Sequence, residues 1–409
     1  MRDFFKVTDL DKVLDYRSEF RHVGTEEISL IDANGRVLAV DAFSDVDLPD
    51  FTRSTMDGFA VKASSTFGAT EGNPAYLSVT GSIAMGETPS FVIGPGEAAR
   101  ISTGGMLPAG ADSVVMIEYV NAIDDQTIEA YRSVAPGQHV VEIAEDFKKD
   151  EKILTRGRKL RPQEVGLLAA FGRESIVVFK KPQVAIISTG DEIVPVDQKP
   201  ERGQIRDINT YTLSCQVHDA GAVPVPFGIV CDNADDLYKA CAQALDQTDM
   251  VLISGGSSVG VRDFSLDVLS ALPDPRILVH GISISPGKPT ILARSGPKAL
   301  WGLPGHVVSA MIVFAVVVRP FIEHIGGLAD EGRLRPPLRA RLSRNVSSAQ
   351  GRVDFIRVKL AYKAGILWAT PILGKSGLIN TMVKADGLIQ VGRDTEGLDE
   401  GSEVEVLQL

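Results

Sequence analysis

The sequence predicts a multidomain protein in which one α/β domain is joined to two mostly-β domains. Residues 182–327 contain three short apolar runs, each followed by a loop of small residues and then by a helical pattern. That repeat is typical of a parallel α/β sheet. Residues 28–144 contain short β-prone runs between Gly, Pro and Asp turns, which predicts a mostly-β domain. Residues 328–409 alternate in polarity with glycines at turn spacing, which predicts a small β-barrel or sandwich.

Length and composition indicate a soluble globular protein with several domains. A chain of 409 residues is long enough for two to four domains. Its hydrophobic share of 44% and charged share of 23% are those of a soluble globular protein, which excludes a disordered or fibrous chain. The formal net charge is −11 and no basic tract is present, so general nucleic-acid binding is not expected.

The same reading predicts a cytoplasmic protein without a membrane span. The longest apolar stretch, residues 307–318, is shorter than the roughly 20 residues that a spanning helix needs, so we expect a buried core helix. The first 15 residues are charged and lack an apolar signal region. Cys215, Cys231 and Cys241 form no CxxC pair, which favours a reducing compartment over a disulfide framework or a zinc site.

The N-terminal half supplies two further helices. A helical pattern begins near Thr8 and ends before His22. The charged connection at 145–181 contains one apolar helix at 165–171.

In the α/β domain, the three loops follow strands predicted at 184–188, 250–253 and 299–303. Asn209 is expected to cap the helix after the first of these strands. Ligands of such sheets bind at the carboxyl ends of the strands, where these loops lie.

The glycine-rich loop at 254–260 is the most suggestive of the three. Its glycines let the backbone approach a ligand, and the helix that follows offers free N–H groups to an anion. The loop is neither a Walker A motif nor a GxGxxG fingerprint, and alone it is equally a turn. Because two similar loops share the sheet, we predict an anion site, with these residues contributing to it: Gly255, Gly256, Ser258 and Gly260.

Charged residues at turns could hold a metal or an oxyanion. Lys288 lies between Pro286 and Pro289, which restrict the backbone and could aim the side chain at an oxyanion, although on this segment alone a solvated surface lysine is the better interpretation. Five carboxylates lie near glycine-containing turns or strand ends, where they can bind Mg²⁺ against phosphate oxygens or simply form turns and caps. They are Asp57, Asp191, Glu192, Asp232 and Asp263. No HExxH pair and no GxSxG elbow is present, so neither a zinc enzyme nor that type of serine hydrolase is expected.

Six segments follow one another along the chain in a recognisable order. They are DLPDFTRSTMDGFAV at 47–61, TGGMLPAGADSVV at 103–115, STGDE at 188–192, GGSSVG at 255–260 with Asp263, PGKP at 286–289 and GLPGHVVS at 302–309. Together they resemble one family, the molybdopterin molybdenumtransferases of the MoeA and gephyrin E-domain type, and the resemblance covers nearly the whole chain.

The resemblance implies four domains and a homodimer. The domains are an elongated one built from residues 1–27 and 145–181, an inserted mostly-β domain at 28–144, a MogA-like molybdopterin-binding α/β domain at 182–327 and a C-terminal β-barrel at 328–409. The site is then expected between the α/β domain of one subunit and the inserted domain of the other. Molybdoenzymes and a molybdopterin adenylyltransferase are the protein partners to expect.

The implied reaction inserts molybdate into adenylylated molybdopterin and releases AMP with the help of Mg²⁺. By resemblance the catalytic residues are Asp57, Thr103, Glu192 and Asp263, and all of these except Thr103 also bind the metal. The resemblance and the loops together assign further residues to substrate binding: Asp146, Asp191, Asp232, Gly255, Gly256, Ser258, Gly260, Lys288, Pro289, Pro304, Ser309, Arg352 and Ser376.

The chain also departs from the family at basic positions. Lysine is frequent in the family where Gly281 and Ser285 stand, and a basic residue is frequent at Val141. Three functions therefore stay open: the ordinary transferase, a non-catalytic molybdopterin-binding or insertion protein, and a paralogue that uses tungstate.

Overall fold

The chain folds into two compact units, which are described separately below. The computed structural model describes residues 7–255, 261–330 and 337–409, with backbone alone for 261–265. The larger unit comprises Met1–Val40, Arg156–Ala169 and Arg173–Leu409, and the smaller unit comprises Asp41–Thr155 and Ala170–Gly172.

The larger unit is built on a six-stranded mixed sheet. The three strands predicted before the candidate loops are parallel, as expected, and a fourth parallel strand at Val223–Val230, which was not predicted, joins them. Two antiparallel strands extend the sheet at one edge. In spatial order the strands are β16 (Val223–Val230), β13 (Gln183–Thr189), β17 (Met250–Gly255), β21 (Lys298–Leu303), β20 (Ile291–Ser295) and β18 (Pro275–His280).

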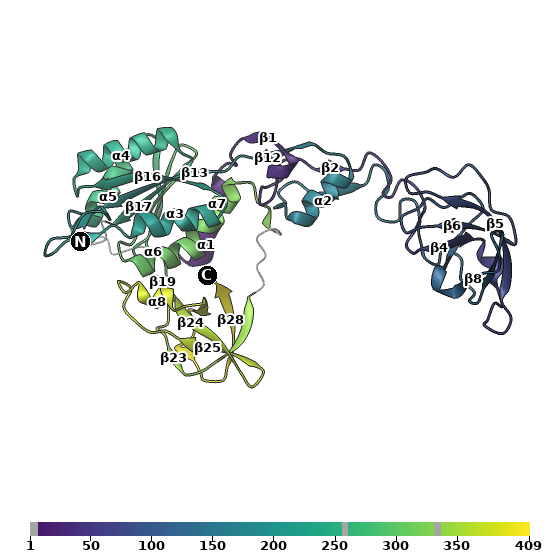
Figure 1. The fold of residues 1–409 in the computed structure, drawn as a ribbon. Coiled ribbons are helices and arrows are strands. Elements are labelled where there is room, and N and C mark those ends of the chain that lie inside the picture. Colours follow the sequence, from purple (N-terminus) through teal and green to yellow (C-terminus); the bar gives the residue numbers. More distant parts are fainter. Residues whose placement is uncertain (1–6, 256–260, 331–336) are drawn as a thin grey trace. The chain divides into compact units, whose positions relative to one another are not determined.

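Helices cover both faces of this sheet (Figure 1). Successive strand residues point to opposite faces, so Val184 and Ile186 pack in one core while Ala185 and Ile187 pack in the other. The first face is covered by α3 (Asn209–Asp219), α6 (Val307–Val313) and α7 (Arg319–Ile325), and the second by α4 (Ala234–Gln247) and α5 (Val261–Ala271).

The predicted core helix is longer than its apolar run. A π-helical turn, η5 (Phe314–Val318), joins α6 to α7, so one helical segment runs from Val307 to Ile325. This segment has the length and composition of a membrane span, yet most of it is buried against the sheet, including Phe314 and Phe321. It is therefore a core helix of the α/β fold.

The C-terminal strands close into a barrel, one of the two architectures that the alternating pattern allowed. Five strands form the ring in the order β22 (Leu338–Leu342), β25 (Ile366–Pro371), β24 (Val353–Lys363), β26 (Gly387–Val391) and β28 (Glu403–Gln408), which pairs back with β22. The short strand β19 (Ile284–Ser285) belongs to the α/β segment of the sequence but pairs in parallel with β24 of the barrel. This strand pairing joins the barrel to the α/β domain. Smaller elements of this region are α8 (Asn380–Val383), β23 (Val346–Ser347) and β27 (Gly397–Leu398).

Residues on either side of the smaller unit also fold together in the larger one. β1 (Thr25–Ser29) pairs with β12 (Ser175–Phe179), and α2 (Pro162–Ala170) begins three residues before the predicted helix. The N-terminal helix α1 (Leu10–Asp15) continues as a 3-10 turn to Glu19.

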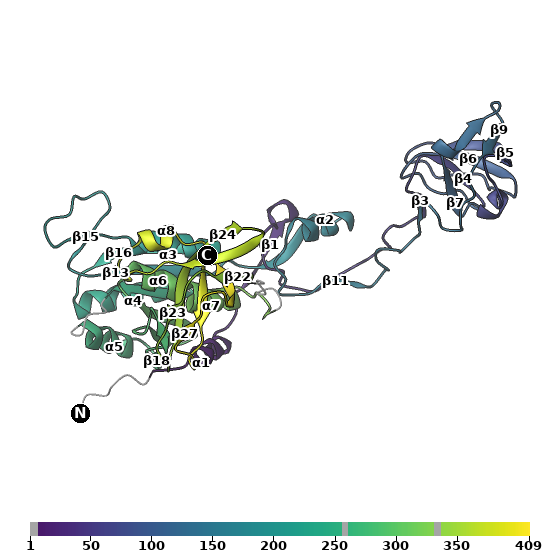
Figure 2. The same cartoon turned by 90° about the horizontal axis from the view of Figure 1, so that it is seen from below.

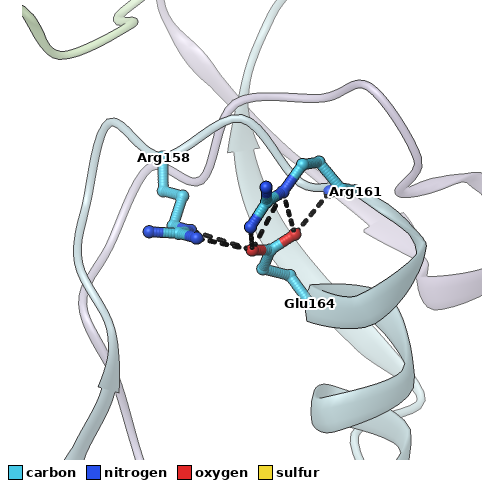
Figure 3. Close-up of polar contacts among 3 residues, drawn as sticks. All are labelled: Arg158, Arg161 and Glu164. Atoms are coloured by element: carbon cyan, nitrogen blue, oxygen red, sulfur yellow. Dashed lines mark hydrogen bonds and ion pairs between the residues drawn. The ribbon is translucent and has the colours of Figure 1, made fainter. Parts of the chain in front are cut away.

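A buried carboxylate fixes the start of α2. Glu164 is 4% exposed and forms ion pairs with Arg158 and Arg161, both at 2.6 Å (Figure 3). Hydrogen bonds from Arg161 first, and then from Arg158, lower the pKa of Glu164 to about 2. The carboxylate therefore ties the helix to the segment that precedes it.

The smaller unit is mostly β, as predicted. Six of its strands form one sheet, in which β4, β6 and β5 lie side by side (Figure 2). The predicted run at 114–120 is interrupted by a 3-10 turn and so becomes two strands. The order is β7 (Ser113–Met116), β4 (Gly58–Val61), β6 (Glu97–Ile101), β5 (Ala75–Ile83), β9 (Thr127–Ala130) and β8 (Val120–Ala122).

The chain enters and leaves the smaller unit through paired strands. β2 (Ala42–Phe43) pairs with β11 (Lys152–Leu154), and farther along β3 (Arg53–Ser54) pairs with β10 (Val140–Val141). An ion pair of 2.6 Å between Lys152 and Asp41 closes the first of these ribbons.

Candidate functional site

The carboxyl ends of the four parallel strands form one edge of the sheet, here called the carboxyl edge. Because parallel strands end on the same side, the loops after β13, β16, β17 and β21 all lie there. Most of the residues singled out in the α/β domain belong to these loops or to the segments that contact them.

Three carboxylates gather after β13 and β16, and they are called the acidic group below: Asp191, Glu192 and Asp232. The Asp232 backbone N–H donates to Asp191 Oδ1 at 3.1 Å. Burial, and then repulsion by Asp191 and Glu192, raise the pKa of Asp232. Its Oδ1 is buried and has no partner in the part of the chain that the structure describes. A cation would relieve both the repulsion and the unsatisfied oxygen.

Asn209 connects two of the loops. The expected helix cap is wrong: Asn209 is the first residue of α3, and its side chain makes no cap. Its Nδ2 instead donates to Ser254 Oγ at 2.6 Å and to the Gly305 carbonyl at 2.8 Å. The end of β17 is thus joined to the loop after β21 through one buried amide. Sequence reasoning missed this function because a bond to residues 45 and 96 positions away leaves no local pattern.

The glycine-rich loop begins where β17 touches β13. Gly255 has φ +125°, and a Cβ there would overlap the Thr189 carbonyl oxygen, so only glycine fits. The remaining predicted loop residues, Gly256, Ser258 and Gly260, lie outside the described residues. The backbone of Asp263 lies in the first turn of α5, and its side chain is outside the described part of the chain.

The loop after β21 contacts the barrel region. Ser376 Oγ lies 2.9 Å from His306 Nδ1, and the Ser376 carbonyl accepts the Val308 N–H at 3.1 Å. Pro304 and Ser309 are both buried beside this loop. The structure thus brings together three of the predicted substrate-binding residues, although they come from two separate stretches of sequence.

The PGKP segment follows β19. Lys288 is exposed and Pro289 is half-buried. Opposite β19, Arg352 Nε pairs with Asp354 Oδ1 at 2.8 Å, and Asp354 is the register partner of Ser285. The Arg352 charge is therefore partly neutralised within the barrel.

Two of the family's frequent lysine positions lie in this region. Gly281 is buried with φ +98°, a conformation that a lysine would adopt only with strain. Ser285 lies in β19 and is half-buried, and the third such position, Val141, lies in β10 of the smaller unit. The backbone conformation at Gly281 therefore favours glycine over lysine.

The smaller unit holds the other predicted site residues. Asp57 lies between β3 and β4, and its Oδ1 accepts hydrogen bonds from Thr103 N at 2.7 Å and from Thr103 Oγ1 at 3.0 Å. These two bonds lower the pKa of Asp57, which stays exposed. Asp146 is exposed in the loop between β10 and β11.

The donor atoms fit Mg²⁺ better than a softer metal. The candidates are all carboxylate oxygens, which hard cations prefer. Among the residues that the structure describes, no group of three His, Cys, Asp or Glu side chains is arranged to hold a metal alone. Magnesium is often held by one or two carboxylates together with substrate phosphates, so the acidic group fits a metal that is shared with a phosphate ligand.

Comparison with known proteins gives matches along most of the chain. Three family models match in order: the MoeA N-terminal region (domain I and II) at residues 8–172, the "Probable molybdopterin binding domain" at 185–324 and the MoeA C-terminal region (domain IV) at 339–409. The molybdopterin molybdenumtransferase of Bacillus subtilis is 33% identical over 94% of this chain and 89% of its own length. That of Haemophilus influenzae is 34% identical over 81% of this chain and 80% of its own. A crystal structure of the molybdopterin biosynthesis protein MoeA from Pyrococcus horikoshii OT3 superposes with a TM-score of 0.85, at 30% identity, over 99% of this chain and 100% of that one.

Proposed function

Since the chain belongs to the MoeA family of molybdopterin molybdenumtransferases, we propose that it inserts molybdate into adenylylated molybdopterin and releases AMP in a reaction that depends on Mg²⁺. The observation that carries the proposal is the acidic group at the carboxyl edge, where a buried Asp232 oxygen has no partner among the described residues. Uncompensated carboxylates at a strand edge are suited to a metal and a phosphoanhydride.

Different residues of the chain would bind the metal, bind the molybdate and position the water. The acidic group would hold Mg²⁺ with the phosphates, and when bound the metal would withdraw charge from the phosphate oxygens. Lys288 would face the molybdate oxyanion. Ser309 and Ser376, which lie beside the loop after β21, would donate hydrogen bonds to it. Asp57, held ionised by Thr103, would position the attacking water.

The bonds balance as follows. Two dithiolene thiols replace one oxo ligand of molybdate, which leaves as water. Another water molecule attacks one phosphorus of the P–O–P bridge, and the bond from that phosphorus to the bridging oxygen breaks. Of the two products, AMP and the pterin phosphate, one takes the oxygen of water and the other keeps the bridging oxygen. We further propose a cytoplasmic homodimer, in which the partner subunit supplies the Asp57 region, and molybdoenzymes or a molybdopterin adenylyltransferase as partners.

The test is reconstitution. Purified protein is mixed with adenylylated molybdopterin, molybdate and Mg²⁺, and AMP is followed by chromatography. AMP release that needs both molybdate and Mg²⁺ is expected. Release no faster than without protein, while the Bacillus subtilis relative is active in parallel, would reject the transferase.

The non-catalytic binding protein is the second candidate, because Gly281 has a backbone conformation that disfavours the lysine frequent there in the family. It predicts pterin binding by calorimetry without AMP release. Saturation curves measured with molybdate and with tungstate distinguish the tungstate paralogue from the other two candidates, because only the paralogue should prefer tungstate.

Asn209→Ala is expected to weaken binding of adenylylated molybdopterin about tenfold, because two hydrogen bonds that join the loops are lost. The binding is measured by calorimetry. Asn209→Asp keeps the size but not the donors, so it should resemble the alanine variant. Ser188→Ala is the matched control: Ser188 is fully buried on the same sheet but bonds to Asp207 and Thr210 instead. Equal weakening in the Ser188 control would contradict the linking role.

A further inference from the structure

A cavity lies at the edge of the α/β sheet opposite to the carboxyl edge. Pro182 precedes β13 and Gly221 precedes β16, so this cavity lies at the amino ends of the strands, away from the carboxyl edge. The Val223 N–H donates to the Pro182 carbonyl at 2.8 Å, which confirms that the two strand starts adjoin. The cavity has a volume of about 240 Å³ and is closed on another side by the end of α7, at Ile322 and Gly326.

The cavity is lined by four basic side chains, and it is called the basic cavity below. They are Arg36, Lys159, Lys180 and Lys181. The one acidic residue in the lining, Glu323, pairs with Arg319 at 2.9 Å. Such a concentration of positive charge is unexpected in a chain with a net charge of −11.

Among the residues that the structure describes, the three lysines have no neutralising partner. Within the described ranges, none of their side chains makes a hydrogen bond or an ion pair. Arg36 differs, because it pairs with Glu26 and donates to the Phe179 carbonyl at 2.9 Å, and its side chain is only 12% exposed. Like charges gathered around one cavity repel each other, and a bound anion would remove that repulsion.

Backbone hydrogen bonds hold the cationic segments in place. The Phe179 N–H donates to the Val37 carbonyl at 2.9 Å, and the Lys180 N–H donates to the Gly24 carbonyl at 2.8 Å. Val37 is also bridged to Lys159. The four cations therefore come from three segments whose backbones are fixed to one another, so binding has to order only the lysine side chains and not the backbone.

We propose that the basic cavity binds a phosphoryl dianion, either free phosphate or the phosphate group of a nucleotide. Its volume is several times the roughly 30 Å³ that one water molecule occupies but lies below the roughly 300 Å³ at which drug-sized pockets begin. The cavity therefore has room for a tetrahedral anion and for part of a group attached to it, and lysines bind phosphate as point charges. This site is independent of the proposed transferase reaction, because no residue of the carboxyl edge takes part in it.

Lysine footprinting tests the proposal residue by residue. The whole protein is acetylated with and without inorganic phosphate, AMP or, as a control for ionic strength, sodium chloride, and modification is measured by peptide mass spectrometry. At a concentration ten times Kd about one site in eleven is free, so acetylation of Lys180 and Lys181 should slow about tenfold. Lys148 and Lys149, an exposed pair in the smaller unit, should not change. Protection by phosphate and AMP alike identifies free phosphate as a sufficient ligand, whereas protection by AMP alone identifies a nucleotide.

A second experiment removes the positive charges and measures the melting temperature. Lys180→Gln with Lys181→Gln should abolish the rise in melting temperature that phosphate or AMP causes through this site. Lys148→Gln with Lys149→Gln should keep that rise. AMP release in the reconstituted reaction should be unchanged in the first variant. Absence of protection at Lys180 and Lys181, or equal protection of all four lysines, overturns the proposal.

Discussion

Asp57→Asn is expected to lower AMP release by about 10²-fold or more, the range for loss of a positioned acid or base, while the protein folds normally. Both hydrogen bonds from Thr103 reach the same oxygen, Oδ1, and an asparagine carbonyl can still accept them. The substitution therefore removes the charge and leaves the local hydrogen bonds. AMP release is measured in the reconstituted reaction across a Mg²⁺ titration, and folding by circular dichroism.

Asp112→Asn is the matched control for this variant. Asp112 Oδ1 also accepts two hydrogen bonds in the smaller unit, from Ala63 N at 2.7 Å and Ser113 Oγ at 3.1 Å, but it was not assigned to the site. It should keep nearly full activity. Because the hydrogen bonds from Thr103 lower the pKa of Asp57, wild-type activity should not fall through protonation of this residue until the pH is below its ordinary value of 3.8. Normal AMP release by a folded Asp57→Asn protein would remove Asp57 from the mechanism.

Glu164→Gln is expected to destabilise the larger unit by about 2–3 kcal/mol at pH 7, because two arginines lose a buried partner. This is less than the roughly 3–5 kcal/mol for fully buried pairs, since Arg158 and Arg161 are themselves about half exposed. Urea unfolding followed by tryptophan fluorescence measures this unit, because the two tryptophans, Trp301 and Trp368, both belong to it.

The pH dependence of this effect has a definite sign. The pKa of Glu164 falls from 4.5 to about 2 on folding, so the carboxylate stabilises the native state above about pH 4.5 and loses that contribution as the pH falls towards 2. The difference between wild type and variant should therefore shrink over that interval. Glu174→Gln, at an exposed position, should change stability by less than about 0.5 kcal/mol. A difference that stays constant from pH 7 to pH 2.5 would show that the charge of Glu164 is not the cause.

Local patterns predicted the parts of the fold that depend on neighbouring residues. The runs at 184–188 and 250–253 became β13 and β17, and the helix after Asn209 ends at Asp219, one residue before the predicted limit. The antiparallel strands β20 and β18 were not predicted, because strand direction depends on pairing between distant segments. Closure of the barrel was one of two alternatives for the same reason.

The candidate site was predictable to a similar degree. The loops after β13, β17 and β21 could be identified because a parallel sheet places them on one edge. The amide of Asn209 and the contact of Ser376 with His306 could not, since each joins residues tens of positions apart. The roles of all the site residues, and the four-domain division, stay predictions, and for Ser258 and Asp263 the side-chain positions also lie outside the described residues.

The ribbon formed by β2 and β11 has a consequence for folding. The 115 residues from 41 to 155 interrupt the larger unit, and the two ends of this segment lie close together, where Asp41 forms an ion pair with Lys152. If this segment unfolded, the rest of the chain would carry a long loop instead of a short connection. Loop-closure entropy grows only with the logarithm of length, so a loop of this size costs about 2 kcal/mol more than one of about ten residues. The larger unit, with the sheet that carries the acidic group, can therefore form before, or without, the segment inserted into that unit.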